Sequence, residues 1–219
     1  APRPGTIYRA IADRPVKGQG GMFLRTPDGS AFLRQVKGLS PGQALLVQVT
    51  GHAEPGKAIP VTARLLFKSR FAIVTPDAPG HNIARGLRDP ELRARLQGIA
   101  RDTMGESGMG LILRSACETG DPEEIAADIT TMRDLADTMA AEATGTGAEK
   151  LLEGDSPHDR AWRDWPRPDT LENDPGCFAA LGLLDRIDAL MMPQVSLPGG
   201  AHAWVEPTRA LVAVDVNTG

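Results

Sequence analysis

The segment Ala203–Gly219 reads A-W-V-E-P-T-R-A-L-V-A-V-D-V-N-T-G and decides how the end of the chain folds. Its apolar run from Ala210 to Val216 is bounded by turn formers, which predicts a buried β-strand. Asp215 interrupts this run. Burying an unpaired carboxylate costs free energy, so we expect Asp215 to be neutralised, paired or bound to a cation.

Two interpretations of this aspartate remain open from spacing alone. Asn217 falls on the same face of an extended strand as Asp215, and a carboxylate beside an amide oxygen is half of a site for Mg²⁺. Alternatively, Asp215 ends the strand and caps the Asn-Thr-Gly turn that follows it.

The 219 residues suffice for one large domain or two small ones, and 41% hydrophobic with 24% charged residues is typical of a globular protein. The sequence shows neither an apolar run of membrane-spanning length nor an N-terminal signal pattern. Cys117 and Cys177 lie 60 residues apart, which favours two buried thiols in a reducing compartment over a disulfide or a metal site. We therefore expect a cytoplasmic protein.

Charge is distributed unevenly along the chain. Residues 1–88 hold 13 Lys and Arg against 4 Asp and Glu, whereas residues 89–219 hold 11 against 24. A basic N-terminal part in an acidic protein indicates a polyanionic partner such as nucleic acid. The alternative is that these basic residues pair with the acidic half.

Residues 5–75 predict short strands separated by Gly/Pro turns, which is typical of a small barrel of the oligonucleotide-binding (OB) type. The expected strands are Thr6–Ala12, Gly21–Arg25, Ala31–Gln35, Ala44–Thr50, Ile59–Leu66 and Phe71–Val74. Phe23 and Phe32 lie on neighbouring strands, where they would either stack nucleic-acid bases or fill the core. Lys57 would hold phosphates, together with Lys37, Arg25 and Arg34.

The next part predicts a layer of helices and strands over residues 67–147. One helix begins at the Asp89-Pro90 pair and ends before Gly105, and a second begins at Asp121-Pro122. A strand, Gly110 to Ser115, lies between them. Further on, an apolar stripe predicts a helix from Phe178 to Met191, and a terminal hairpin follows Gly200.

Arg114 and Ser115 end the strand between the two helices. A planar guanidinium beside a hydroxyl is suited to hold a terminal phosphate, and Arg85 would supply a second charge. The alternative is a structural ion pair between Arg114 and Glu118 or Asp121.

Four stretches of the chain resemble the catalytic region of the ribonuclease E/G family of bacterial endoribonucleases. They are Ala44–Val49 with Gly56-Lys57, Ile73–Pro76 through Ile83–Arg85, Gly108–Ala116, and Leu197–Gly200 through Glu206–Leu211 to Asp215–Asn217. The resemblance implies a mixed α/β (α+β) fold: an OB-type RNA-binding barrel (1–66), an inserted α/β 5′-sensor domain (67–152), part of an RNase H-like segment (153–190), and the first hairpin of a DNase I-like nuclease subdomain (191–219).

The resemblance also implies a role for each candidate residue. Asp215 would be one of two aspartates that hold a catalytic Mg²⁺, and Asn217 would lie beside the scissile phosphate. A 5′-monophosphate would bind Arg114, Ser115, Arg85, Ile73 and Ser69, where the family commonly has Thr in place of Ser115. Single-stranded RNA would bind Phe23, Phe32 and Lys57.

This chain also departs from the family pattern. By the family pattern, a second metal-binding Asp would lie some forty residues beyond the first, past residue 219. The cysteines that share zinc across a dimer would also lie past residue 219. The short N-terminal piece of the RNase H-like fold would precede residue 1. We therefore expect a Mg²⁺-dependent endoribonuclease that prefers 5′-monophosphorylated single-stranded RNA, of which this chain alone is an inactive fragment. The alternative is a non-catalytic RNA-binding protein that senses 5′ ends. Homo-oligomer formation stays open.

Overall fold

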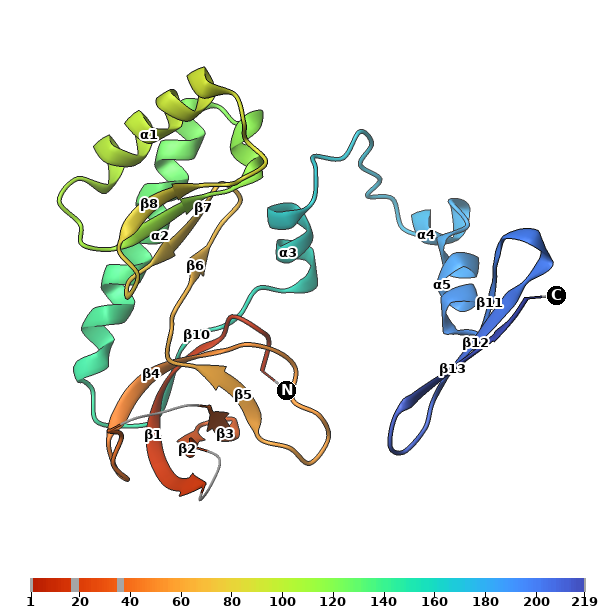
Figure 1. Ribbon diagram of the computed structural model, residues 1–219, viewed down its shortest axis with the longest axis horizontal. Coiled ribbons are helices and arrows are strands. Elements are labelled where there is room, and N and C mark those ends of the chain that lie inside the picture. The colour runs from red at the N-terminus through yellow and green to blue at the C-terminus, as the bar shows by residue number, and fades with distance from the viewer. Residues whose placement is uncertain (1, 17–19, 35–37, 219) are drawn as a thin grey trace. The chain divides into compact units, whose positions relative to one another are not determined.

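The computed structural model describes residues 2–16, 20–34 and 38–218. By its internal contacts the chain divides into two compact units, residues 1–167 and 168–219 (Figure 1). The fold is mixed α+β, as predicted. The finer boundaries expected at 66/67, 152/153 and 190/191 stay predictions. None of the described helices combines the length and the apolar character needed to cross a lipid bilayer.

The first unit contains a closed five-stranded barrel in the order β1-β2-β3-β5-β4-β1, and β10 extends it on the free edge of β1. The strands are β1 (Ile7–Val16), β2 (Gly21–Thr26), β3 (Gly29–Leu33), β4 (Ala44–Val49), β5 (Ile59–Thr62) and β10 (Glu149–Leu152). β3 and β5 run parallel, and the other neighbours are antiparallel. This topology is consistent with the predicted OB-type barrel.

Strict alternation of side chains builds the barrel interior. Met22 and Leu24 of β2 and Ala31 and Leu33 of β3 are buried, so the residues between them face outward. β1 runs four residues further than predicted, and its pairing register with β2 shifts between Ala12 and Arg14. Such a bulge bends a strand, which lets one long strand pair on both sides of the closed barrel. Gln35 and Lys37 lie outside the described residues.

A four-stranded sheet in the order β6-β7-β9-β8 forms the second layer of this unit. Its strands are β6 (Phe67–Lys68), β7 (Ala72–Thr75), β8 (Gly80–Ile83) and β9 (Gly110–Leu113). Helices α1 (Pro90–Met104) and α2 (Pro122–Ala141) pack against each other, α1 on β8 and α2 on β6 and β7 (Figure 1). The shared core includes Leu96, Leu111 and Ile129, each of which is fully buried.

Both helices begin where the sequence predicts. The Asp89 carboxylate accepts a hydrogen bond from the Glu91 backbone N–H, and the Asp121 carboxylate accepts from the N–H groups of Glu123 and Glu124. Proline occupies the first helical position in each case.

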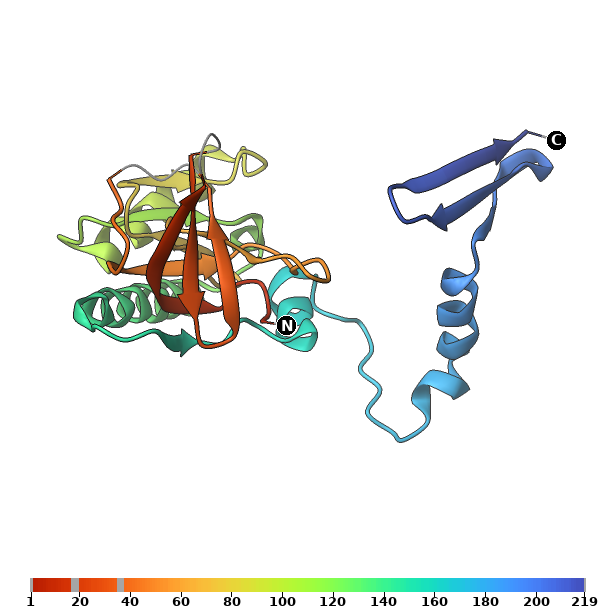
Figure 2. The same ribbon diagram turned by 90° about the horizontal axis from the view of Figure 1, so that it is seen from below.

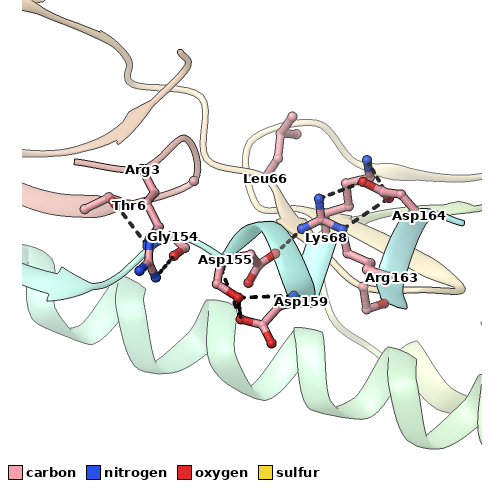
Figure 3. Close-up of polar contacts among 12 residues, drawn as sticks. Arg3, Thr6, Leu66, Lys68, Gly154, Asp155, Asp159, Arg163 and Asp164 are labelled. Atoms are coloured by element: carbon pink, nitrogen blue, oxygen red, sulfur yellow. Dashed lines mark hydrogen bonds and ion pairs between the residues drawn. The ribbon is translucent and has the colours of Figure 1, made fainter. Parts of the chain in front are cut away.

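After α2 a one-turn helix, η2 (Glu142–Thr144), leads into β10, and the chain returns to the barrel and continues to α3 (Pro157–Asp164) (Figure 2). The Gly154 backbone N–H donates to the Thr6 hydroxyl at 3.0 Å, and the Arg3 guanidinium donates to the Gly154 carbonyl at 3.5 Å (Figure 3). These hydrogen bonds join residues that are 148 and 151 positions apart in the sequence. They attach the segment after β10 to the residues that precede β1.

The second unit contains α4 (Cys177–Ala180), α5 (Leu183–Met191) and a three-stranded sheet, β11-β12-β13. The strands are β11 (Gln194–Ser196), β12 (His202–Pro207) and β13 (Val212–Asn217), and the one-turn helix η3 (Pro198–Gly200) lies between β11 and β12. The predicted terminal hairpin is confirmed as the antiparallel pair β12–β13.

Three expectations for this part of the chain are wrong. The single helix from 178 to 191 is two helices, because Gly182 adopts a left-handed φ of 63° that a continuous helix cannot contain. β13 is not buried: Val212, Val214 and Val216 are each more than half exposed on the edge strand of a small sheet. Cys117 is buried, as expected, but Cys177 is only partly buried.

Candidate nucleic-acid interface

Phe23 and Phe32 form a cross-strand aromatic pair on the outer face of the barrel. Their Cα atoms are direct partners in the β2–β3 register, and their ring centroids lie 5.3 Å apart at 50°. Both side chains are partly exposed, and neither belongs to the buried barrel core. The alternative that they fill the core is therefore wrong, and their rings are partly exposed on the barrel surface.

The pair lines an open groove of about 1350 Å³ on the barrel. Lys57 and Arg34 also line it, as the sequence analysis anticipated for phosphate contacts, and Lys57 forms an exposed ion pair with Glu54. Arg14 and Arg64 are additional lining cations that sequence reasoning missed. The Cζ atom of Arg14 lies 5.0 Å from the centroid of the Phe23 ring, a cation–π distance.

Arg14 could not be located from periodicity. It faces Phe23 because the bulge in β1 shifts the register of the β1–β2 pair by one residue after Ala12. The resulting groove places aromatic faces and positive charges side by side, which is the combination that binds single-stranded nucleic acid.

The residues expected to bind a 5′-phosphate come from the same end of the second sheet. Ser69 lies in the β6–β7 turn and Arg114 directly follows β9; the Arg114 N–H donates to the Phe71 carbonyl at 2.8 Å. Ile73 lies on β7, paired with Ile112 of β9. The pairing of β6, β7 and β9 thus brings Ser69, Ile73 and Arg114 to the same end of the sheet.

Arg85 and Ser115 occupy the adjoining loops. β8 is parallel to β9, and the Ala84 N–H donates to the Leu113 carbonyl at 2.8 Å, which brings the residue before Arg85 to the end of β9. Ser115 begins the one-turn helix η1 (Ser115–Glu118), and both Arg85 and Ser115 are exposed. All five predicted residues therefore gather at one end of one sheet.

Arg114 is paired, but not with the acids that the sequence suggested. Its guanidinium donates to the Ser69 carbonyl and to Asp164 Oδ1 of α3, the latter at 2.6 Å. Asp121 instead caps α2. The carboxylate of Asp164 accepts hydrogen bonds from Arg163, Arg114 and Lys68, which hold its pKa well below its usual range. Arg163 has the largest effect.

Asp164 and Lys68 are thus site residues that sequence reasoning missed. The Lys68 ammonium lies 3.1 Å from Asp164 Oδ1. A capping box was a usable signal for the helix that carries Asp164: Ser156 and Asp159 exchange hydrogen bonds at the start of α3. Which residues of that helix meet Arg114 depends on a contact across 50 residues of sequence, which has no local signal.

In the second unit, Asp215 and Asn217 both lie on β13, opposite Trp204 and His202 of β12 respectively. Both side chains are exposed and share one face of the strand. Their oxygen donors suit Mg²⁺ in kind, but they supply one carboxylate. Within the described parts of the chain, no group of three or more His, Cys, Asp or Glu residues is arranged to hold a metal ion.

Comparison with known proteins places these sites in a family context. The chain is 30% identical to ribonuclease E of Nostoc sp. over 83% of its length, 25% identical to ribonuclease E of Synechocystis sp. over 98%, and 23% identical to ribonuclease G of Haemophilus influenzae over 81%. The alignments cover 31%, 40% and 43% of these relatives, so the chain spans about a third to two fifths of their length.

The sequence model of the Ribonuclease E/G family matches residues 67–173 and 167–219, which includes the sheet with Arg114 and the hairpin with Asp215. The matched residues make up more than half of the chain. The chain that carries this groove, this arginine and this aspartate therefore belongs to the ribonuclease E/G family.

Proposed function

We propose that this chain binds single-stranded RNA and recognises its 5′-monophosphate as part of a Mg²⁺-dependent endoribonuclease that acts in the cytoplasm. The observation that carries the proposal is the partly exposed Phe23–Phe32 pair in a groove lined by Arg14, Arg34 and Lys57. Bases stack on the aromatic faces, and the cations offset the charge of the RNA backbone. The names of the relatives support the nuclease assignment.

The 5′ end of the RNA binds at the end of the second sheet. Arg114 supplies a planar guanidinium and Ser115 an exposed hydroxyl, which together can bind several phosphate oxygens. Arg85 adds charge from the neighbouring loop, and Ile73 of β7 and Ser69 of the β6–β7 turn belong to the same end of the sheet. A 5′-hydroxyl lacks the charge that these groups recognise.

Cleavage in the whole protein involves Asp215 and Asn217. Asp215 is an oxygen ligand for the metal, and the Asn217 amide binds beside the scissile phosphate. The chemistry that Mg²⁺ supplies when bound is activation of a water molecule and stabilisation of the charge that develops on the phosphate. The products carry 5′-phosphate and 3′-hydroxyl ends. With one carboxylate for the metal, this chain alone binds RNA without cutting it.

Binding is tested with one single-stranded oligoribonucleotide that carries a fluorophore at its 3′ end and either a phosphate or a hydroxyl at its 5′ end. Fluorescence anisotropy should give a lower Kd for the phosphorylated form. Arg114→Ala should erase this difference, while Arg95→Ala, which removes the same charge from an exposed position of α1, should preserve it. Equal affinities for both ends in the unaltered chain would refute recognition of the 5′-phosphate.

The groove is tested with the same hydroxylated oligomer. Phe23→Ala with Phe32→Ala should weaken binding by about tenfold or more, the loss of roughly 1–3 kcal/mol per stacked base.

The metal assignment is tested in a longer protein that includes the remaining length of the relatives. There Asp215→Asn should abolish Mg²⁺-dependent cleavage and leave the Kd for RNA within a few-fold. Retained cleavage would show that Asp215 is not a metal ligand.

The alternative function, a non-catalytic protein that senses RNA 5′ ends, is favoured by the structural contrast between the two sites. All five 5′-phosphate residues are held at one sheet end, whereas Asp215 and Asn217 lie on an exposed hairpin. Absence of cleavage in the longer protein, with 5′-end discrimination retained, would support this alternative.

A further inference from the structure

Asp164 is the last residue of α3, and its carboxylate contacts three cations. Its Oδ1 atom lies 2.6 Å from Arg114 Nη2. Oδ1 also lies 3.1 Å from Lys68 Nζ, and Oδ2 lies 2.9 Å from Arg163 Nη2 (Figure 3). Arg163 precedes it on the same helix, but Arg114 and Lys68 come from the sheet. The side chains of Asp164 and Arg114 are only 26% and 19% exposed, so these contacts are partly shielded from water.

Lys68 and Arg114 reach the same oxygen atom from two different strand ends. Lys68 ends β6 and Arg114 follows β9, so the sheet itself brings the two cations to one point. Two cations that contact one oxygen atom form an anion-binding site. The Asp164 carboxylate occupies the position at which a phosphate oxygen would bind. Asp164 is ionised at neutral pH, and the hydrogen bonds that it accepts from Arg163, Arg114 and Lys68 lower its pKa further.

We infer that Lys68 is a further ligand of the RNA 5′-phosphate beside Arg114, and that Asp164 is an internal carboxylate that the phosphate must displace. The inference rests on the proposed recognition of a 5′-monophosphate at Arg114. It adds a ligand to that site and assigns to Asp164 the role of lowering the affinity for phosphorylated ends.

The helix that carries Asp164 can give up this contact without losing its own charge pairs. Arg163 donates to Asp164 through both Nε and Nη2, and it also pairs with Asp155. α3 contributes no residue to the buried core, and its capping box lies within its own first turn. Arg70 donates to the backbone carbonyls of Trp162 and Trp165, so this end of α3 stays attached to the sheet when the Asp164 carboxylate is displaced.

The 5′-phosphate has the advantage in this exchange. A phosphate monoester carries about −1.5 to −2 charges at neutral pH and three acceptor oxygens, against one charge on a carboxylate. It can therefore bind Lys68 and Arg114 at once and leave acceptors for Ser115. A 5′-hydroxyl carries no charge, so it leaves Asp164 in place. Asp164 therefore lowers the affinity for the phosphorylated end and leaves the affinity for the hydroxyl end unchanged.

The test measures the ratio of Kd values for 5′-hydroxyl and 5′-monophosphate forms of one 3′-labelled oligoribonucleotide, using the whole chain. Asp164→Asn should raise this ratio by about three- to tenfold, because a competing partly exposed ion pair is removed. Lys68→Gln should lower the ratio by a similar factor. Asp102→Asn, which removes a negative charge from an exposed position on α1, should leave it unchanged. Far-UV circular dichroism and thermal melting verify that each variant is folded.

The outcomes separate the two claims. The inference is overturned if the ratio for Asp164→Asn is unchanged or lower while Arg114→Ala still erases discrimination. The proposed function would then remain intact. A lower ratio would mean that Asp164 orients Arg114 instead of competing for it. An unchanged ratio in Lys68→Gln would remove Lys68 from the ligand set. If the unaltered chain does not distinguish the two ends, the proposed 5′-phosphate site fails, and this inference fails with it.

Discussion

The two units of the chain contain similar apolar patterns but bury them to very different extents. In residues 1–167, Leu96, Leu111 and Val74 are fully buried between the sheet and its helices. In residues 168–219, Leu190 of α5 is 84% exposed and Val214 of β13 is 63% exposed. An apolar pattern shows that a segment has a face to bury, but it does not identify what covers that face.

This difference bears directly on the candidate sites. Arg114 and Ser69 are positioned by strands whose other residues are locked in a core, so their relative geometry follows from packing. Asp215 and Asn217 are positioned by the pairing of β13 with β12. We therefore expect the proposed 5′-phosphate site to be preorganised by packing, and the positions of Asp215 and Asn217 to depend on the hairpin.

The largest effect is expected where the two ends of the first unit meet. A Cβ atom on Gly154 would contact the Pro4 carbonyl oxygen and would lie 2.8 Å from the Thr6 nitrogen and 2.9 Å from the Arg3 carbonyl oxygen, all of them backbone atoms. Gly154→Ala should lower the free energy of unfolding by about 3 kcal/mol, because backbone must move to admit the methyl group. Urea denaturation followed by circular dichroism measures the change.

Gly147→Ala is the matched control, because a Cβ atom at Gly147 meets nothing within 4 Å. Its effect should stay within about 0.5 kcal/mol. Equal stability of the two variants would show that the contact between residues 3–6 and Gly154 is not formed in solution. The first unit would then lack the contact between residues 3–6 and Gly154 that joins its two ends.

Much of the first unit could be predicted from the sequence because its signals are local. Asp-Pro pairs fixed the starts of α1 and α2, and alternation placed Phe23 and Phe32 on adjacent strands. The five residues proposed to bind the 5′-phosphate were identified from a family resemblance, and the strand register brings them to one end of the sheet. What could not be predicted depends on long-range contacts or on exposure: the Arg114–Asp164 pair, the position of Arg14 at the β1 bulge, and the exposed state of β13.

A matched pair of valines tests the contrast in burial. Val74 is at the centre of the buried sheet and Val214 is within the exposed hairpin, and both lie on strands. Val74→Thr should lower the free energy of unfolding by about 2 kcal/mol, because a hydroxyl replaces a methyl group in a dry core. Val214→Thr should change it by less than about 0.5 kcal/mol. A comparable loss for Val214→Thr in urea denaturation would show that β13 is covered in solution.

The smallest expected effect concerns the charges of Asp164, and its sign depends on pH. Hydrogen bonds from Arg163, and after it Arg114 and Lys68, lower the pKa of Asp164 in the folded state. A carboxyl whose pKa falls on folding stabilises the protein above its unfolded pKa of about 3.9, and it loses that contribution as the pH falls toward the folded pKa. Asp164→Asn should therefore cost about 0.5–1 kcal/mol at pH 7.

The difference between Asp164→Asn and the unaltered chain should shrink as urea denaturation is repeated from pH 5 down to pH 3. Asp215→Asn provides the matched control in the second unit, where the carboxylate is exposed on β13, and we expect less than about 0.5 kcal/mol at pH 7. A pH-independent difference for Asp164→Asn would mean that shape, not charge, holds α3 against the sheet. In that case Asp164 would not lower the affinity for a 5′-phosphate, because displacing its carboxylate from Lys68 and Arg114 would cost little free energy.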